Sequence, residues 1–385
     1  DTLNNIYATG LFFGNVSLAS GITISSAGPY SDFFMLKMDA AGNYNWARKG
    51  ISITGGFDYA EGLTIKVSHD QNHVIAGGTF RGKEFIFGVD SLLSPGNTAA
   101  DSYIMSVNAA TGTTHFIKAI TGAGYTEVAD LDVDGLDNIY VTGYCESNTF
   151  TSPATIINNT GTYNIFVFKY NSAGAFIWST ALGNSTYAHE STSILVNHHN
   201  KVLISGYFSH HLQNGSFLIT GYGMFLAVLD TNKTALSLDK ATTSLASNIY
   251  NRYMSIDTAD NVYFNGSLYN GVSTFGTITY TATGNQLFNA KFGNPTSIPT
   301  NLHAANALDG VSIYPNPATD VVIVSGKNIE RVELKDVWGR EMIRDTGKDK
   351  ERYELTISNL SEGVYFICVR DNAGKQQQKK IVISR

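Results

Sequence analysis

Two pairs of histidines have a residue type that would suit metal chemistry, because imidazole nitrogen is a common ligand of zinc. They are His198-His199 and His210-His211. The segment between His199 and His210 is typical of a β-strand, and eleven extended residues span roughly 35 Å. Four histidines separated in this way cannot share one ion. We interpret them as loop histidines at opposite faces and expect no metal site.

A second candidate for metal chemistry is the acidic run Asp132-Val133-Asp134-Gly135-Leu136-Asp137, which looks like part of a calcium-binding loop. Such a loop needs a bidentate glutamate at its twelfth position, and this sequence has none there. The run also lies where every repeat of the chain has a turn. We therefore interpret these residues as a turn rather than as a calcium site.

Three glutamates could support hydrolysis. Glu61, Glu127 and Glu190 recur at similar positions, each just before a predicted strand, so they could surround one face of a repeat array. Glycosidases use a pair of carboxylates about 5–10 Å apart, and such a ring could supply one. Repetition of a structural residue accounts for the same pattern, and we favour that interpretation. We therefore expect no enzyme, with a secreted hydrolase of glycan or protein as the alternative.

Composition limits the remaining classes of function. The sequence contains no nucleophile elbow, HExxH motif, P-loop or dinucleotide fingerprint, so no cofactor is expected. The net charge of −6 argues against a general nucleic-acid binder, because there is no basic excess to meet phosphates. No apolar run approaches the roughly 20 residues of a membrane helix, so the chain is expected not to span a membrane. Cys145 and Cys368 fall in different predicted domains, which argues against a disulfide framework.

Composition and repetition together predict an all-β fold. The chain has 37 glycines, 21 tyrosines and 21 phenylalanines but only 15% charged residues, which favours many short strands joined by turns. A strand phrase that ends in glycine occurs five times, and these glycines are 68, 65, 63 and 60 residues apart. The five copies are Asn5–Gly10, His73–Gly78, Asn138–Gly143, Lys201–Gly206 and Asn261–Gly266.

A second phrase follows each first one. Its copies are Phe33–Asp39, Ser102–Asn108, Ile165–Asn171, Phe225–Asp230 and Leu287–Gly293. Beyond a turn comes an aromatic residue, which is Trp46, Phe116 or Trp178 in the first three copies, with Leu238 in that position of the fourth. A further strand precedes each later copy of the first phrase. The unit is therefore four short strands in about 60 residues.

Repeated four-stranded units predict a β-propeller, because one blade cannot bury both of its faces without neighbouring blades. The chain begins at the second strand of the first unit and stops at the third strand of the fifth, which gives 18 strands where five blades need 20. We therefore expect about five blades of a larger ring, with further blades before Asp1. The best copy, Asp134–Gly143 with Phe166–Asn171 and Trp178, resembles the bacterial β-propeller repeat of secreted Bacteroidota proteins. That resemblance implies a fold and no single activity.

Charge density predicts a domain boundary. Residues 1–310 hold 13 Lys and Arg against 21 Asp and Glu, whereas residues 311–385 hold 13 against 11. A small domain needs more charged surface for its size. The polar segment between these regions contains two prolines, which is typical of a linker. We predict a propeller region over 1–294, a linker over 295–308 and a C-terminal domain over 309–385.

The C-terminal domain shows about six or seven short alternating strands in some 75 residues, which predicts a small immunoglobulin-like β-sandwich. Its motifs are similar, in kind and order, to those of the type A C-terminal sorting domain of the type IX secretion system. They are a Tyr-Pro-Asn-Pro-Ala start, a Gly-Arg turn, a Leu-x-x-Gly-x-Tyr strand and a terminal Lys-Lys-Ile-Val. The matching residues are Tyr314, Pro315, Asn316, Pro317, Asp320, Gly339, Arg340, Leu360, Gly363, Tyr365, Lys379, Lys380, Ile381 and Val382.

The resemblance implies a protein that is exported across the outer membrane and is then attached to the cell surface or released. Its partners would be the outer-membrane shuttle barrel, the translocon and the sortase of that system. The recognition elements would be Leu360, Gly363, Tyr365 and the last strand, Lys379–Ile383. The same residues could simply hold the sandwich together, although an exposed terminal strand is also an edge for β-addition. For the propeller we expect a binding or adhesion module with a glycan or protein ligand.

Overall fold

The computed structural model describes residues 1–53, 58–94, 99–146, 149–156, 164–183, 187, 189–243, 249–275, 278–292, 311–336, 341–347, 350–372 and 376–384. The chain divides into two compact units, Asp1–Asn294 and Pro295–Arg385. In the described residues the only helical element is the 3-10 turn η1, Ala19–Gly21, and all other elements are strands. No helix in these ranges is long and apolar enough to cross a membrane. The all-β prediction is confirmed.

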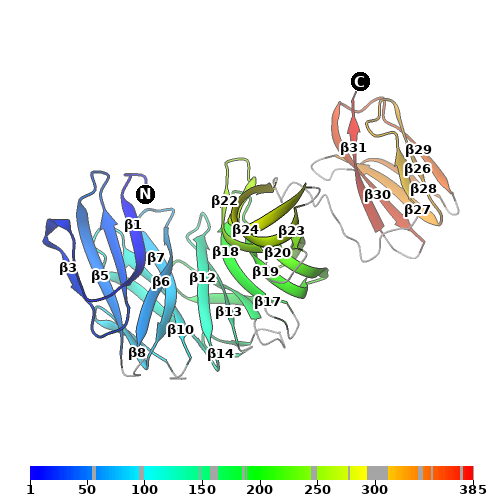
Figure 1. The fold of residues 1–385 in the computed structure, drawn as a ribbon. Helices are drawn as coiled ribbons and strands as arrows, with labels where there is room; N and C mark the ends of the chain where they lie inside the picture. The colour runs from blue at the N-terminus through cyan, green and yellow to red at the C-terminus, as the bar shows by residue number, and fades with distance from the viewer. Residues whose placement is uncertain are drawn as a thin grey trace. The chain divides into compact units, whose positions relative to one another are not determined.

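The first unit consists of five successive groups of antiparallel strands, which we call blades 1 to 5 (Figure 1). Blade 1 contains β1 (Ile6–Phe12), β4 (Asp32–Met38) and β5 (Tyr44–Ile53); blade 2 contains β6 (Tyr59–Val67), β7 (His73–Arg81), β10 (Asp101–Asn108) and β11 (Thr114–Gly122). Blade 3 contains β12 (Thr126–Val133), β13 (Ile139–Cys145), β16 (Asn164–Tyr170) and β17 (Phe176–Leu182). Blade 4 contains β18 (His189–Val196), β19 (Lys201–Asn214), β20 (Phe217–Asp230) and β21 (Ala235–Thr243); blade 5 contains β22 (Ile249–Ile256), β23 (Val262–Phe275) and β24 (Ile278–Phe292). All 18 predicted blade strands are present, in propeller-blade order.

Hairpins between the second and third strands hold neighbouring blades together. The hairpin of β8 (Glu84–Phe87) and β9 (Asp90–Leu93) leaves blade 2 and pairs with β5 of blade 1. The hairpin of β14 (Thr149–Ser152) and β15 (Ala154–Ile156) leaves blade 3 and pairs with β11 of blade 2. In the same way β23 of blade 5 pairs with β21 of blade 4. In blade 1 the corresponding hairpin is β2 (Asn15–Ser17) with β3 (Thr23–Ser25).

A register shift interrupts the first strand of blades 2, 3, 4 and 5 at an equivalent point. A bulge of this kind bends the strand and re-aims a side chain. In blade 3 the re-aimed residue is Asp130, which accepts hydrogen bonds from Thr64 Oγ1 of blade 2 at 2.8 Å and from Ser193 Oγ of blade 4 at 2.9 Å. Ser193 Oγ in turn accepts a hydrogen bond from Met254 N of blade 5 at 3.2 Å. One run of polar groups therefore joins the first strands of four blades.

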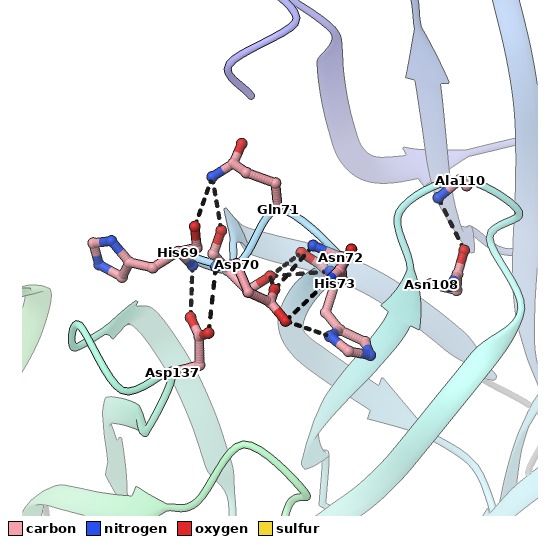
Figure 2. Close-up of polar contacts among 9 residues, drawn as sticks. His69, Asp70, Gln71, Asn72, His73, Asn108, Ala110 and Asp137 are labelled. Atoms are coloured by element: carbon pink, nitrogen blue, oxygen red, sulfur yellow. Dashed lines mark hydrogen bonds and ion pairs between the residues drawn. The ribbon is translucent and has the colours of Figure 1, made fainter.

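The acidic run Asp132–Asp137 ends β12 and then forms a turn from Asp134 to Asp137, where a turn was predicted. The Asp134 carboxylate accepts two backbone N–H groups of that turn, at 2.9 and 3.0 Å. Asp137 has a left-handed φ of 60° and reaches the neighbouring turn of blade 2. Its carboxylate accepts His69 N at 2.6 Å and Asp70 N at 3.4 Å (Figure 2). These acidic residues therefore satisfy backbone donors, one within its blade and one between blades.

Indole side chains on the fourth strands connect blades 1 and 3 to the blades that follow them. Trp46 Nε1 donates to Ala109 O of blade 2 at 3.3 Å. Trp178 Nε1 donates to Thr231 O of blade 4 at 3.1 Å. Each indole thus satisfies a carbonyl in a turn of the next blade while its ring packs against the core.

The prediction that Leu238 occupies this position in blade 4 is wrong. The strand register places Ser237 there, because Val228 pairs with Ser237 as Lys169 pairs with Trp178 in blade 3. Side chains alternate between the two faces of a strand, so an offset of one residue exchanges the faces. Leu238 instead packs into the core that blades 3 and 4 share.

The second unit is a two-sheet β-sandwich, as predicted, with seven strands in its described residues. One sheet has the order β25, β26, β29 and the other has the order β28, β27, β30, β31. The strands are β25 (Ser312–Tyr314), β26 (Val321–Ser325), β27 (Ile329–Lys335), β28 (Glu341–Thr346), β29 (Arg352–Thr356), β30 (Gly363–Asp371) and β31 (Gln376–Ile383). Alternate residues of both sheets, such as Val322, Leu334 and Ile367, form its core.

We predict that Asp130→Ala lowers the free energy of unfolding of the first unit by about 3 kcal/mol, because it leaves several donors without an acceptor. Urea unfolding of the full chain, followed by tryptophan fluorescence, measures this change. Asp90→Ala, on the short strand β9, is the control and should shift stability by less than about 0.5 kcal/mol. Equal losses in the two variants would contradict the bridging role of Asp130.

Candidate functional site

The three glutamates singled out by their spacing lie in the first strands of three consecutive blades. Glu61, Glu127 and Glu190 occur within the first three residues of β6, β12 and β18. The sequence pattern placed these glutamates just before the strands. In the structure each strand begins slightly earlier, so the glutamates lie inside the strands. Each precedes the bulge of its strand by the same number of residues, so the three side chains share one end of the unit. All three are half-buried.

Tyrosine hydroxyls surround these carboxylates. Tyr125 and Tyr144 both donate to Glu127 Oε2, the second at 3.1 Å, and their ring centroids are 5.8 Å apart. Tyr207 donates to Glu190 Oε1. We call this set the carboxylate–tyrosine cluster; it consists of Glu61, Glu127, Glu190, Tyr59, Tyr125, Tyr144 and Tyr207.

The cluster is also one electrostatic unit. Burial raises the pKa of Glu61, and repulsion from Glu127 raises it further. Burial likewise raises the pKa of Glu190, where the Tyr207 hydrogen bond opposes the shift and Glu127 adds to it. The pKa of Tyr144 is raised by burial and then by the charges of Glu127 and Glu190. Glu127 therefore influences the glutamates of both neighbouring blades.

The histidine pairs lie apart, as predicted. His198 Nδ1 and His199 Nδ1 contact the two carboxylate oxygens of Asp260 at 2.6 and 2.5 Å, on a turn. His210 stacks on Tyr187 with ring centroids 3.8 Å apart, and it lies inside β19 rather than in a loop, because the β19–β20 hairpin continues beyond it. Within the described ranges, no group of three or more His, Cys, Asp or Glu could hold a metal ion.

In the C-terminal domain the first predicted motif lies against the last. Asn316 Oδ1 accepts a hydrogen bond from Val382 N at 2.9 Å, across 66 residues of sequence. Ala318 N donates to Val382 O at 2.8 Å, and Ser384 N donates to Ala318 O at 3.0 Å. We call these contacts the terminal seam. Sequence reasoning did not bring the two motifs together.

The terminal seam covers only one end of the last strand. β31 pairs along its length with β30, and the pairing found on its other edge, among the described residues, is the Ala318↔Ile383 bridge. Lys379 is exposed and Ile381 is buried in the core. The side chain of Lys380 lies outside the described residues. The edge before the seam therefore offers backbone groups to a partner strand.

The Leu-x-x-Gly-x-Tyr motif has a clear structural role. Gly363 has a φ of 150°, a region that side chains other than glycine rarely adopt. Tyr365 OH donates to Ser361 O at 3.0 Å, which is the geometry of a tyrosine corner. Leu360 packs against the core of the sandwich. These residues shape the bend that leads into β30.

The remaining motif residues are mostly at the surface. Tyr314 is 45% exposed, and Pro315 and Pro317 are also exposed. Asp320 is exposed, and its backbone oxygen accepts Ile357 N at 2.8 Å. Gly339 and Arg340 lie outside the described residues. The predicted motifs thus divide into buried residues that build the fold and exposed residues that a partner can reach.

We predict that Glu127→Gln lowers the pKa of both Glu61 and Glu190, because it removes the charge that repels them. In the folded state the pKa values of these two carboxyl groups lie above the ordinary value of 4.5, so the folded state loses stability as the pH rises from 4.5 through the raised values. The variant should lose less stability over that pH range, because its two pKa values are raised less. NMR titration of ¹³C-labelled glutamate carboxyl groups measures the pKa values of Glu61 and Glu190. Glu84→Gln, on β8, should leave the two pKa values unchanged, and the same shift in that variant would contradict the coupling.

Comparison with known proteins gives a family for the second unit. Residues 312–384 match the family described as secretion system C-terminal sorting domain. Among curated proteins, the uncharacterized WD repeat-containing protein L264 of Acanthamoeba polyphaga mimivirus is 24% identical over 246 residues, which are 54% of this chain and 17% of that protein. Beta-agarase D of Zobellia galactanivorans is 31% identical over 74 residues, which are 19% of this chain and 15% of that protein. The chain therefore spans less than a fifth of either relative.

Two solved structures also align with the chain. PorZ, described as an essential bacterial surface component of the type IX secretion system of Porphyromonas gingivalis, is 11% identical, with a TM-score of 0.21, over 98% of this chain and 75% of that chain. Quinohemoprotein alcohol dehydrogenase from Comamonas testosteroni is 12% identical, with a TM-score of 0.33, over 99% of this chain and 76% of that chain. At these TM-scores neither likeness carries an argument.

The matched range covers all seven described strands of the sandwich, from β25 to β31. Residues 312–384 thus match a C-terminal sorting domain, and such a domain marks a protein for secretion through the type IX system to the cell surface or the extracellular space.

Proposed function

We propose that the propeller of this exported protein is a binding module that takes a glycan at the carboxylate–tyrosine cluster. The observation that carries the proposal is the placement of three glutamates at one register of three consecutive blades, with tyrosines beside them. Carboxylate oxygens accept hydrogen bonds from sugar hydroxyls. Aromatic rings offer apolar faces to the C–H groups of a sugar ring. A row of such groups suits a ligand that itself repeats.

The electrostatics of the cluster also favour a ligand. Glu61 and Glu190 have pKa values raised by burial and by Glu127, so ionising them is less favourable than in water. A residue kept only for stability would not be expected to carry this cost. A ligand that donates hydroxyl hydrogen bonds to the charged form would offset it. Perturbed carboxylates gathered in one place are typical of functional sites.

A secreted hydrolase is the second candidate, and one observation favours it. Glycosidases pair a carboxylic acid of raised pKa with an ionised carboxylate. Glu61 or Glu190 could supply the acid and Glu127 the partner charge. The three residues come from near-equivalent positions, however, and binding is compatible with that regularity whereas catalysis usually requires one blade to differ.

We predict that a glycan array probed with the full chain identifies a bound polysaccharide, and that Glu127→Gln weakens its binding at least tenfold. The reason is that Glu127 contacts or influences the cluster residues of three blades. Glu84→Gln serves as the matched control and should bind as well as the unaltered chain. If both variants bind the glycan as well as the unaltered chain, the cluster is refuted as the site. Turnover of the bound glycan, abolished in Glu127→Gln, would establish the hydrolase instead.

For export, we propose that the outer-membrane shuttle barrel and the translocon read the exposed motif residues and the open edge of β31, and that the sortase acts on the domain afterwards. Tyr314 and Lys379 are exposed motif residues, so a partner can contact them without unfolding the sandwich. The open part of the β31 edge can accept a partner strand beside them. Buried motif residues such as Ile381 would act through the fold.

We predict that the double variant Tyr314→Ala, Lys379→Ala folds normally but is exported at least tenfold less, because it removes only surface contacts. Quantitative immunoblots of medium, cell surface and periplasm measure export, and thermal melts verify folding. The control is Met342→Ala, Arg352→Ala, which removes a similarly exposed apolar and basic pair from the same domain. Normal export of the first variant would show that these two residues are not read.

A further inference from the structure

Blades 1 and 3 share a row of three side chains that fills the space against the next blade. The row takes one residue from each of the second, third and fourth strands, and the three lie opposite one another in the ladder. We call it the Tyr–Lys–Trp row; it consists of Tyr7, Lys37 and Trp46 in blade 1 and of Tyr140, Lys169 and Trp178 in blade 3. The lysine ammonium lies over the tyrosine ring, 5.4 Å from the ring centroid in blade 1 and 4.8 Å in blade 3. Tyr263 and Lys291 repeat this arrangement in blade 5, at 5.3 Å.

The row also satisfies polar groups around it. The tyrosine hydroxyl donates to a carboxylate in the turn before its strand, which is Asp1 at 3.0 Å in blade 1 and Asp134 at 3.1 Å in blade 3. Lys37 Nζ and Trp46 Nε1 both donate to Ala109 O of the following blade, at 3.2 and 3.3 Å. The repeat therefore places an aromatic ring and an ammonium group at this position.

Blade 2 has different residues at the three positions of the row. The ladder places Ile75, Ser106 and Phe116 there. Phe116 keeps the aromatic packing on the next blade, because its ring lies against Gly174 of blade 3, but it has no N–H group to donate. Ile75 and Ser106 are smaller than tyrosine and lysine, and neither carries a ring or a positive charge. The ring and the ammonium group are therefore missing between blades 2 and 3.

A cavity of about 280 Å³ lies in this space. Ile75 and Ser106 line it from blade 2, and Ile139 lines it from blade 3. Ser172, whose carbonyl corresponds to Ala109 O, is also part of its wall. The volume is just below the roughly 300–1,000 Å³ of ordinary ligand pockets, so the cavity suits a small ligand.

Blade 4 shows that loss of the row does not by itself favour a polar cavity. Its residues at the three positions are Leu203, Val228 and Ser237. Leu203 and Val228 are buried in the core shared with blade 5, so apolar packing replaces the tyrosine and the lysine there. In blade 2, by contrast, the middle position is the polar Ser106, and the space beside it has polar walls.

Titratable groups form these walls. His73 and His115 come from the second and fourth strands of blade 2, and their rings stack with centroids 4.5 Å apart. Asp70 Oδ2 lies 3.8 Å from His73 Nδ1, and Asp137 reaches the same turn from blade 3 (Figure 2). Burial lowers the pKa of His115 and His73 lowers it further, which favours a neutral ring. The hydrogen bond from Ser68 lowers the pKa of Asp70, which favours the charged carboxylate.

The chemistry of the walls favours a cation that carries an aromatic ring. Asp70 and Asp137 both line the cavity, and no lysine or arginine is among the residues found to line it. An ammonium group is therefore attracted to this cavity. The imidazole rings offer aromatic contacts, and Ile75 and Ile139 offer apolar ones. A space left by missing side chains can be filled by a small molecule of matching shape.

We propose that the cavity between blades 2 and 3 binds a small aromatic amine. Its ring and its ammonium group take the places that the tyrosine ring and the lysine ammonium have in blades 1, 3 and 5. The ring packs against the stacked histidines and Ile75, and the ammonium group pairs with Asp70. The site is separate from the carboxylate–tyrosine cluster, because Glu61 lies near the beginning of β6 whereas Ser68 follows its end.

The test uses the full chain and three probes of similar shape. Tyramine carries a phenol ring and an ammonium group, 4-ethylphenol has no charge, and 3-(4-hydroxyphenyl)propionate is an anion. Isothermal titration calorimetry should show saturable binding of tyramine, at least tenfold tighter than that of either other probe. In NMR spectra of ¹³C-labelled histidine, tyramine should shift the ring signals of His73 and His115 but not those of His198. No saturable binding, or equal binding of the three probes, would overturn the proposal.

One double variant refills the cavity with the residue types of the other blades. Ile75→Tyr, Ser106→Lys should weaken tyramine binding at least tenfold, because the side chains of the protein then occupy the space. Ser91→Lys, at an exposed position of β9, is the control for the added charge and should bind normally. Thermal melts establish that both variants fold. Undiminished binding in the folded double variant would refute the cavity as the site.

A milder variant tests the charge and decides the question if the double variant does not fold. Asp70→Asn keeps an oxygen that can accept the Ser68 hydroxyl but removes the negative charge. It should weaken tyramine binding at least tenfold and leave the binding of 4-ethylphenol unchanged. Asp90→Asn, on β9, is the matched control and should bind both probes as the unaltered chain does. Equal tyramine binding by the two variants would show that Asp70 does not hold the ammonium group and would overturn the proposal.

Discussion

The propeller depends on one constraint, which is that a blade has two apolar faces and neighbouring blades must bury them. Stacking the blades brings their first strands together, so polar groups on those strands must find partners in adjacent blades. The repeated bulge solves this problem by turning Thr64, Asp130 and Ser193 sideways at the same level. Asp130 joins blades 2 and 4 through blade 3. The same repetition that packs the apolar faces therefore also satisfies the polar groups between them.

Repetition has a second consequence at the opposite side of the bulge. Residues that share a register in neighbouring blades become neighbours in space, whatever their chemistry. Burial raises the pKa of Glu61 and Glu190, and placing Glu127 between them brings like charges together, which raises both pKa values further. The hydrogen bond that Tyr207 donates opposes the shift of Glu190 only in part. Packing alone gives no reason for acidic residues at this position, and that is the argument for assigning the cluster to a ligand.

The sequence predicted the blade strands because each copy of the repeat confirms the others. The connecting hairpins were not predicted, because strands as short as β15, Ala154–Ile156, have no periodicity and their partner belongs to another blade. Leu238 was misplaced because the turn before the fourth strand varies in length. Trp46 and Trp178 follow Asp39 and Asn171 by seven residues, whereas Phe116 follows Asn108 by eight, so spacing alone does not distinguish Ser237 from Leu238. Contacts between distant motifs, such as Asn316 with Val382, have no local signal either.

The terminal seam suggests why a sorting signal should be a folded domain rather than a linear tail. The motif residues expected from the sequence include Tyr365 and Ile381, which are buried and unavailable to a partner while the sandwich is folded. They can contribute to recognition only by fixing where the exposed residues stand. Because the seam ties the first motif to the last strand, the exposed Tyr314 side and the β31 edge are correctly arranged only after the whole domain has closed. A partner that binds both elements therefore detects completion of folding as well as sequence.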